Sequence, residues 1–110
     1  MLNQIASLDL MFRALADPTR RAIIDRLARG EASVSELARP FDMSLSAVHQ
    51  HLQAIEEAGV MSWSKKGRVR RCRLEPRALD GAAGWIVQRR AIWNRRLDAL
   101  ERHLKWGRKT

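Results

Sequence analysis

Amide, hydroxyl and imidazole side chains gather in one short segment, residues 44–53. An amide such as that of Gln50 can accept from N6 of adenine while it donates to N7, and a hydroxyl or an imidazole can make a single hydrogen bond to a base. Residues 40–64 contain no Lys or Arg, so this segment suits base edges better than phosphates. The base-reading set that we expect is Ser44, Ser46, His49, Gln50 and Gln53.

Lysine and arginine are concentrated after that segment. Residues 1–59 hold 6 Lys+Arg against 8 Asp+Glu, a net charge of −2, whereas residues 60–110 hold 15 against 4, a net charge of +11. A basic half of this kind suggests a polyanion as partner, and nucleic acid is the usual one. Attraction to phosphates is expected from Lys65, Lys66, Arg68 and Arg70.

Not every arginine is expected to serve that purpose. Successive residues of a strand face opposite ways, so Arg71 and Arg73 lie on the other face from Arg68 and Arg70, and we expect one of the two sets to meet phosphates. Residues 20 and 21, both arginine, stand near the start of a packed helix and are predicted to be structural.

Motifs for catalysis or for a bound metal are missing. There is no phosphate-binding glycine loop, no His-Glu-x-x-His and no serine in a nucleophile elbow. His49 and His51 are two residues apart, about 200° around a helix, and cannot hold one metal together. His51 is expected to be a half-buried structural residue. We predict no enzyme activity, no metal site and no cofactor.

The single cysteine, Cys72, cannot form a disulfide within the chain, which fits a reducing compartment. Neighbouring arginines would favour a thiolate, so a redox sensor is one interpretation. An inert, packed thiol is the other, and we favour it because no resolving cysteine is present.

Capping residues and apolar spacing predict four helices in residues 1–59. The second of them turns Ile23, Ile24 and Leu27 inward and stops at Gly30. The third has the capping-box spacing, with Ser33 followed by Glu36. In chain order the predicted N-caps are Ser7, Asp17, Ser33 and Ser44.

The fourth helix is predicted to end at Gly59 and to be amphipathic. Its apolar stripe consists of Leu45, Val48, Leu52 and Ile55, and the opposite face is polar. A short helix, a tight turn and a helix with a polar outer face predict a helix-turn-helix over residues 33–59.

The pattern changes after Gly59 to short segments rich in Val, Trp and long side chains. They predict a β-hairpin with a basic tip over residues 60–74, the wing of a winged helix-turn-helix. A long last helix is predicted for 81–104, followed by a frayed end at 105–110. The fold class is therefore mainly α with a two-stranded wing, in one DNA-binding domain over 1–110.

Apolar residues of the last helix exceed what one 110-residue domain readily covers. Large exposed apolar patches usually mark interfaces, so we expect a homodimer in which residues 1–16 and 81–104 are the dimerisation helices. The predicted interface residues are Leu8, Phe12, Trp85, Ile92, Trp93, Leu97, Leu100 and Leu104.

Four stretches in this order resemble the ArsR/SmtB family of winged-helix regulators. They are FRALADPTR at 12–20, SVSELA at 33–38, SLSAVHQHL at 44–52 and EEAGV at 56–60. The resemblance implies a homodimer, formed by the first and last helices, that binds an operator and represses transcription. Metal-sensing members carry two cysteines where this chain has Ser33 and Ser35, and their Asp/His pattern is not reproduced around Asp98 and His103.

The expected function is thus sequence-specific binding of double-stranded DNA at an inverted-repeat operator, by a cytoplasmic repressor with no membrane segment and no visible signal peptide. Two alternatives stay open. One is a non-specific, charge-driven coating or RNA-binding protein, which the scarcity of Phe and Tyr disfavours. The other is a repressor gated by a small molecule between the dimer helices, around Trp85 and Trp93, or by oxidation of Cys72.

Overall fold

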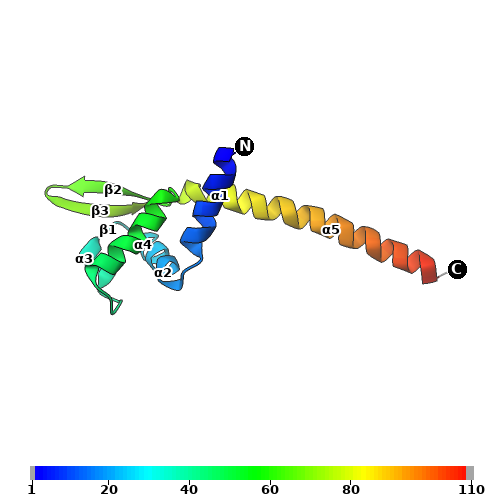
Figure 1. Cartoon of the computed structure of the whole chain (residues 1–110), viewed down its shortest axis with the longest axis horizontal. Helices are drawn as coiled ribbons and strands as arrows, with labels where there is room; N and C mark the ends of the chain where they lie inside the picture. The colour runs from blue at the N-terminus through cyan, green and yellow to red at the C-terminus, as the bar shows by residue number, and fades with distance from the viewer. Residues whose placement is uncertain (1, 109–110) are drawn as a thin grey trace. The chain divides into compact units, whose positions relative to one another are not determined.

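The structure is a computed structural model that describes residues 2–108 and the side chains of residues 7–107. The limits of the predicted domain, residues 1 and 109–110, lie outside the described residues. The chain divides into two compact units, Met1–Asp80 and Gly81–Thr110. The elements (Figure 1) are α1 (Leu2–Leu15), α2 (Pro18–Leu27), β1 (Ala32–Ser33), α3 (Val34–Ala38), α4 (Leu45–Glu57), β2 (Met61–Lys66), β3 (Val69–Leu74), the 3-10 helix η1 (Pro76–Leu79) and α5 (Asp80–Arg108).

Helix α2 begins as predicted, at a side chain that satisfies a free backbone N–H. The Asp17 carboxylate accepts a hydrogen bond from the backbone N–H of Arg20 at 3.0 Å, and Pro18 occupies the first helical position. The three predicted inward residues of α2 are buried. Helix α1 differs from the prediction, because it begins at Leu2 and contains Ser7. Apolar residues at 2, 5, 8 and 12 continue the helical spacing past that serine.

The helix-turn-helix is confirmed at both predicted caps. The Ser33 hydroxyl accepts from the backbone N–H of Glu36 at 3.2 Å, and the Ser44 hydroxyl accepts from the backbone N–H of Ala47 at 3.1 Å. Helix α3 is only five residues long, and its Leu37 is buried. Helix α4 contacts α1, α2 and α3, so three helices support the one whose outer face is polar.

The sheet has three antiparallel strands in the order β1-β3-β2, one more than predicted. Strand β1 is two residues long and pairs with the middle of β3, with Ala32 opposite Cys72. Strands β2 and β3 form the predicted hairpin, which extends away from the helices of the first unit (Figure 1). Its turn is Gly67-Arg68, where Gly67 has φ +64 and Arg68 a negative φ, as in the II′ turns that suit hairpins. Lys65 and Lys66 therefore belong to β2 rather than to the loop, and Arg68 belongs to the turn.

The core of the first unit lies between α1–α4 and the sheet. Its largest fully buried side chains are Ile23, Leu37, Val48, Leu52, Ile55, Val60 and Cys72. Within the described residues no polar or charged side chain is fully buried. The second unit is α5, whose 29 residues extend about 43 Å at 1.5 Å per residue. It continues helically to Arg108, four residues beyond the predicted end.

Candidate nucleic-acid interface

All five residues of the predicted base-reading set lie on α4 or at its N-cap, and all five are exposed. Two of them already have a partner. The Ser44 hydroxyl oxygen caps the helix, so its proton is still available for donation. The Gln53 amide donates to Oε1 of Glu57 at 3.4 Å. The structure thus brings together a hydrogen-bonding surface on one side of a helix.

Charge is distributed unevenly along α4. Its first three turns carry no charged side chain, whereas Glu56 and Glu57 stand exposed at its C-terminal end. The backbone N–H groups of the first turn add partial positive charge at the N-terminus. A polyanion is therefore attracted to the N-terminal part of α4 and repelled from its last turn.

The inner side of α4 differs from the prediction at one position. Val48, Leu52 and Ile55 are buried, as predicted, but Leu45 is 54% exposed. Leu45 is the first residue of the helix, and the packed elements cover the apolar stripe only from Val48 onward. The prediction of an inward Leu45 was therefore wrong.

Arg20 connects α4 to the end of α1. Its guanidinium donates to the backbone carbonyls of Ala14 at 3.0 Å and Arg13 at 2.6 Å, in the last turn of α1. A third N–H group faces Nδ1 of His51, on α4, at 3.3 Å. Arg21 likewise donates to the carbonyl of Leu15 at 2.7 Å. The predicted half burial of His51 is confirmed, and both arginines contact the end of the packed helix α1, as a structural role requires.

Asp17 completes this cluster. Its Oδ2 lies 3.9 Å from Nδ1 of His51, and the same oxygen caps α2. The hydrogen bond from the backbone N–H of Arg20, with the positive charge of the Arg20 guanidinium, holds the pKa of the Asp17 carboxyl below its ordinary value. Three helices are tied together beside the exposed hydrogen-bonding face of α4.

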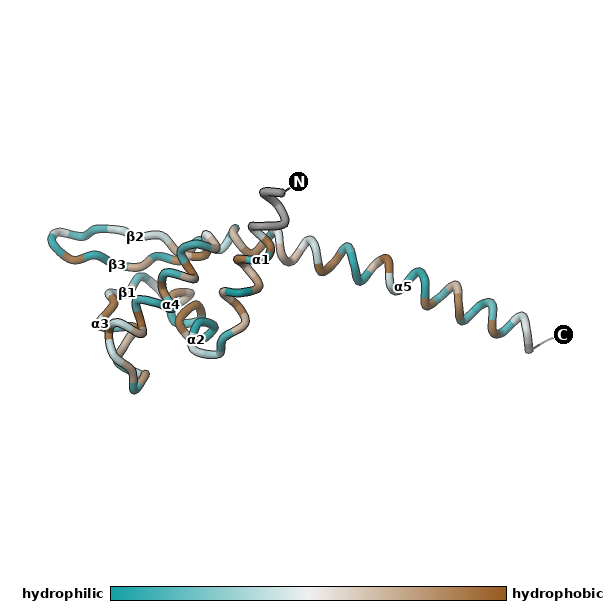
Figure 2. Tube along the Cα trace, in the orientation of Figure 1, coloured by the Kyte–Doolittle hydropathy of each residue, from teal (hydrophilic) through white to brown (hydrophobic). Residues whose placement is uncertain are grey.

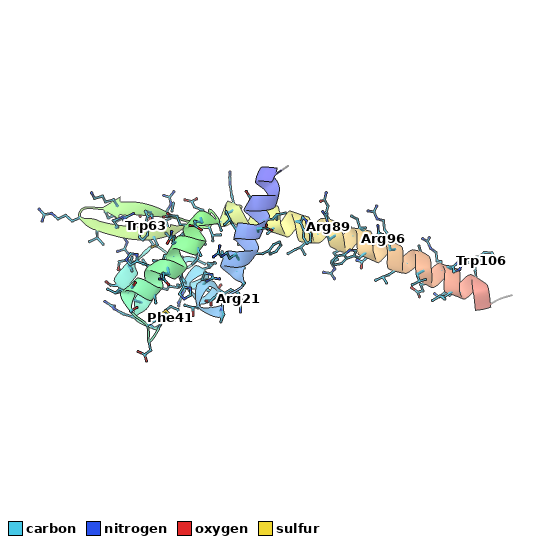
Figure 3. All side chains as sticks on the ribbon, in the orientation of Figure 1. Arg21, Phe41, Trp63, Arg89, Arg96 and Trp106 are labelled. Carbon is cyan, nitrogen blue, oxygen red and sulfur yellow. The ribbon has the colours of Figure 1, made fainter. Side chains whose placement is uncertain are left out.

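The four predicted phosphate-binding cations are exposed in the hairpin. None of them forms an ion pair with a carboxylate in the part of the chain that the structure describes. Lys65 lies opposite Arg70 in the strand register, so these two share one face. Trp63 lies on the same face, two residues before Lys65 in β2. The guanidinium of Arg70 lies 4.3 Å from the centroid of the Trp63 ring, which Figure 3 shows on the hairpin. Sequence reasoning missed this contact because it depends on the cross-strand register.

Arg71 and Arg73, on the other face, are engaged with carboxylates. Arg71 lies 3.3 Å from Oε1 of Glu36 and donates to the backbone carbonyl of Glu31 at 3.1 Å. Arg73 lies 3.4 Å from Oε1 of Glu75. Hydrogen bonds from Ser62 and Arg73 hold the pKa of Glu75 below its ordinary value, so this carboxylate stays ionised beside the arginine. Arg71 and Arg73 therefore differ from the four predicted phosphate-binding cations, because carboxylates already balance their charge.

Glu36 joins this network to the predicted capping box. Burial works against ionisation of its carboxyl, but the hydrogen bond from Ser33 and the charge of Arg71 outweigh it and hold the pKa below the ordinary value. The Ser33 hydroxyl thus has a structural role at the position where metal-sensing members have a thiolate. No cluster of metal-ligating side chains exists among the described residues.

Cys72 is fully buried in the sheet. Desolvation raises the pKa of its thiol to about 11, against the opposing effect of Arg70. A protonated, buried thiol reacts slowly, so the structure favours inert packing over redox sensing.

The predicted interface residues of α5 fall into two sets. Trp85 and Ile92 are half-buried, whereas Trp93, Leu97, Leu100 and Leu104 are 53 to 62% exposed. The exposed four are spaced by four, three and four residues, which places them along one side of the helix. Figure 2 shows hydrophobic segments recurring along α5 between hydrophilic ones. In the first unit, Leu8 is half-buried and Phe12 exposed.

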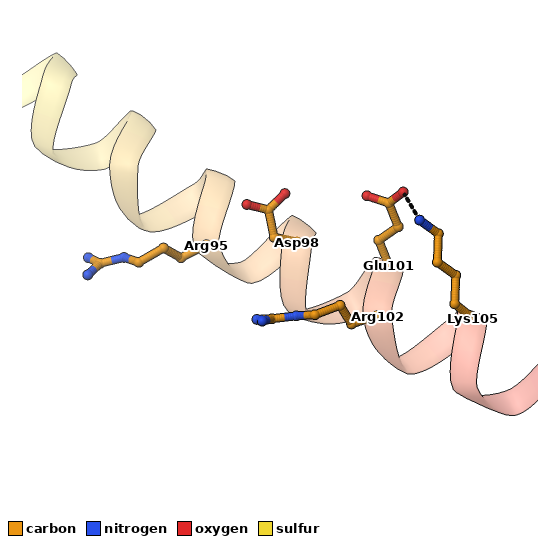
Figure 4. A pocket seen from close by; sticks show the side chains of 5 residues that line it. All are labelled: Arg95, Asp98, Glu101, Arg102 and Lys105. Carbon is orange, nitrogen blue, oxygen red and sulfur yellow. Dashed lines mark ion pairs between the residues drawn. The ribbon is translucent and has the colours of Figure 1, made fainter.

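Another side of α5 is charged. Arg95, Asp98, Glu101, Arg102 and Lys105 line a shallow surface depression in which Lys105 pairs with Glu101 at 3.2 Å (Figure 4). All five residues lie on the one helix, and their ionic groups are those of a solvated helix face. Within the described residues no helix is long and apolar enough to cross a membrane.

The geometry is that of a winged helix-turn-helix, and the chain is similar to known proteins of this kind. A family model described as a helix-turn-helix domain matches residues 15–62. The HTH-type transcriptional regulator Rv2034 of Mycobacterium tuberculosis is 44% identical over 96 residues, which cover 87% of each chain. The transcriptional repressor SdpR of Bacillus subtilis is 31% identical over 77 residues, which cover 70% of this chain and 86% of the relative.

Solved structures extend the likeness beyond the helix-turn-helix. An ArsR-like transcriptional regulator from Rhodococcus sp. RHA1 has a TM-score of 0.81 and 34% identity, covering 91% of this chain and 94% of that one. A homodimeric winged helix-turn-helix DNA-binding domain from Mycobacterium bovis, a possible ArsR-family regulator, has a TM-score of 0.60 and 28% identity, covering 79% and 80%.

The chain belongs to the ArsR/SmtB family of winged helix-turn-helix transcriptional regulators. The fold class predicted from the sequence is confirmed, with one strand added. Because the relatives are regulators and repressors, the prediction that the chain is not an enzyme is confirmed as well.

Proposed function

We propose that this regulator is a dimeric repressor in which α4 reads the major groove of an operator and the hairpin holds the flanking phosphates. The observation that carries the proposal is the pairing of two surfaces in one compact unit. One is the exposed, uncharged hydrogen-bonding face of α4, and the other is a hairpin with four cations that have no carboxylate partner among the described residues. Base edges suit the first surface and phosphates the second.

The reading residues in this proposal are Ser44, Ser46, His49, Gln50 and Gln53. Gln50 has the central role, because its amide is exposed and can make two hydrogen bonds to one adenine. Gln53 has a weaker one, because Glu57 competes for its amide. The phosphate contacts come from Lys65, Lys66, Arg68 and Arg70, since carboxylates already pair with Arg71 and Arg73.

Dimerisation is proposed through α1 and the exposed apolar side of α5. Four large exposed apolar side chains within three turns would be costly in water, and a second copy is the partner that the homodimeric neighbour supports. A two-fold axis would place two α4 helices on half-sites about 34 Å apart, so the operator is proposed to be an inverted repeat. The action is proposed to be repression, as the resemblance to the transcriptional repressor SdpR supports, and its proposed location is the cytoplasm.

The test is binding to the DNA upstream of the protein's own gene, by footprinting and by fluorescence anisotropy against random DNA and RNA of equal length. We expect a protected inverted repeat bound at least a thousandfold more tightly than random DNA. Gln50→Ala should reduce that ratio, and the matched control Gln88→Ala, an exposed glutamine of α5, should leave it unchanged. Equal affinity for every DNA, or tighter binding to RNA, would support the charge-driven alternative instead.

A further inference from the structure

We propose that Leu45 is a specificity-determining residue that recognises thymine, by contact of its side chain with the C5-methyl group in the major groove. The inference rests on the proposed function, since it requires α4 to enter that groove. It adds a residue that the amphipathic pattern had assigned to the core.

Leu45 differs in chemistry from the other exposed residues of α4. Leu45 is 54% exposed, and it is the only apolar side chain among the exposed residues of α4. The other exposed residues of this helix are Ser46, His49, Gln50, Gln53, Glu56 and Glu57. An exposed leucine is common on protein surfaces, but here it stands within a set of hydrogen-bonding groups.

The second observation is position. Leu45 directly follows the N-cap Ser44 and lies about 40° around the helix from His49, so it borders the reading face in the first turn. The N-terminal residues of a recognition helix are those that meet base edges. Because Glu56 and Glu57 repel phosphates at the other end, α4 must approach DNA with this turn leading.

The group on the DNA that suits an exposed leucine is a methyl group. The thymine C5-methyl is the largest apolar group that the major groove displays, since cytosine has only a hydrogen at C5, and the nitrogen and oxygen groups there are hydrogen-bond donors or acceptors. Leucine placed on a donor or an acceptor would remove water from it without replacing the hydrogen bond. Leu45 therefore favours thymine through the methyl contact and disfavours other bases through desolvation.

The experiment removes the methyl group from the DNA and the side chain from the protein. Each thymine of the footprinted operator is replaced in turn by deoxyuridine, symmetrically in both half-sites. Wild-type protein and Leu45→Ala are then compared by fluorescence anisotropy. At one thymine position in each half-site, deoxyuridine should lower the operator affinity of the wild-type protein by about fourfold per half-site, which is the effect of one buried methyl group. Leu45→Ala should bind the thymine operator more weakly than the wild type does, and its affinity should not change when that thymine is replaced by deoxyuridine.

Two controls separate this result from a general defect. Val87→Ala, an exposed apolar residue of α5, should retain the wild-type sensitivity to deoxyuridine. Thermal unfolding of Leu45→Ala should match the wild type, because the side chain is exposed. If the operator binds but no thymine is sensitive, or if Leu45→Ala keeps the sensitivity, the inference is overturned while the proposed function stands. If no operator binds, the proposed function fails with it.

Discussion

The pairing of Arg73 with Glu75 leads to a quantitative prediction for the hairpin. Lys66 is exposed and has no carboxylate partner among the described residues, whereas Arg73 lies 3.4 Å from Glu75. Each phosphate contact contributes about 0.9 to the slope of log affinity against log salt, so Lys66→Ala in a dimer with two hairpins should lower the slope by about 1.8. Between about 50 and 200 mM salt, the affinity gap to the wild type should then narrow roughly tenfold.

The matched control is Arg73→Ala, which removes an arginine from the same hairpin. Its slope should equal that of the wild type, because Glu75 already neutralises that guanidinium. Gln50→Ala should also keep the wild-type slope while it weakens operator binding by about 1–3 kcal/mol and random DNA hardly at all. Anisotropy titrations over a salt series measure all three variants. Equal slopes for Lys66→Ala and Arg73→Ala would refute the distinction between hairpin cations that have a carboxylate partner and those that have none.

Three further predictions concern the rest of the chain. Trp93→Glu together with Leu97→Glu should convert the dimer to monomers in sedimentation, and a monomeric wild type at micromolar concentration would contradict the proposed interface. Zinc, cadmium or trivalent arsenic should leave DNA affinity unchanged under reducing conditions, because Ser33 and Ser35 replace thiolates, and stoichiometric metal binding with loss of affinity would be the contrary result. The raised pKa of Cys72 stabilises the fold below the thiol's ordinary value of 9.0, and that contribution is lost as the pH rises toward about 11. Between these pH values, the free energy of unfolding measured with urea should therefore fall more steeply for the wild type than for Cys72→Ala. Parallel curves of this free energy against pH would contradict the burial of the thiol.

Helix starts could be predicted from the sequence because their causes are local. Asp17, Ser33 and Ser44 each accept a hydrogen bond from a backbone N–H three residues ahead, so the residues that decide the boundary lie within one turn of it. The exposure of the five proposed reading residues could be predicted for the same reason, since the cap position and helical periodicity place them away from the apolar stripe.

Features that depend on distant parts of the chain could not be predicted. Strand β1 is two residues long and exists because it pairs with β3, forty residues later, so no periodicity marks it. The engagement of Arg71 depends on Glu31 and Glu36, which α3 and β1 bring to it. The exposure of Leu45 depends on where the neighbouring elements end. Its membership of the apolar stripe was visible in the sequence, but coverage of that stripe is a tertiary property.

The position of α4 rests on polar contacts as well as on its apolar side. Val48, Leu52 and Ile55 fix which face is turned inward, but apolar contacts are non-directional and permit small shifts along the helix axis. Arg20 adds directional restraint, because one guanidinium bonds two carbonyls at the end of α1 and also meets His51 on α4. The same guanidinium therefore relates a proposed dimer helix to the proposed reading helix. In a two-fold dimer the separation of the two α4 helices must match a half-site spacing, and a tie between α1 and α4 is the kind of contact that such a spacing requires.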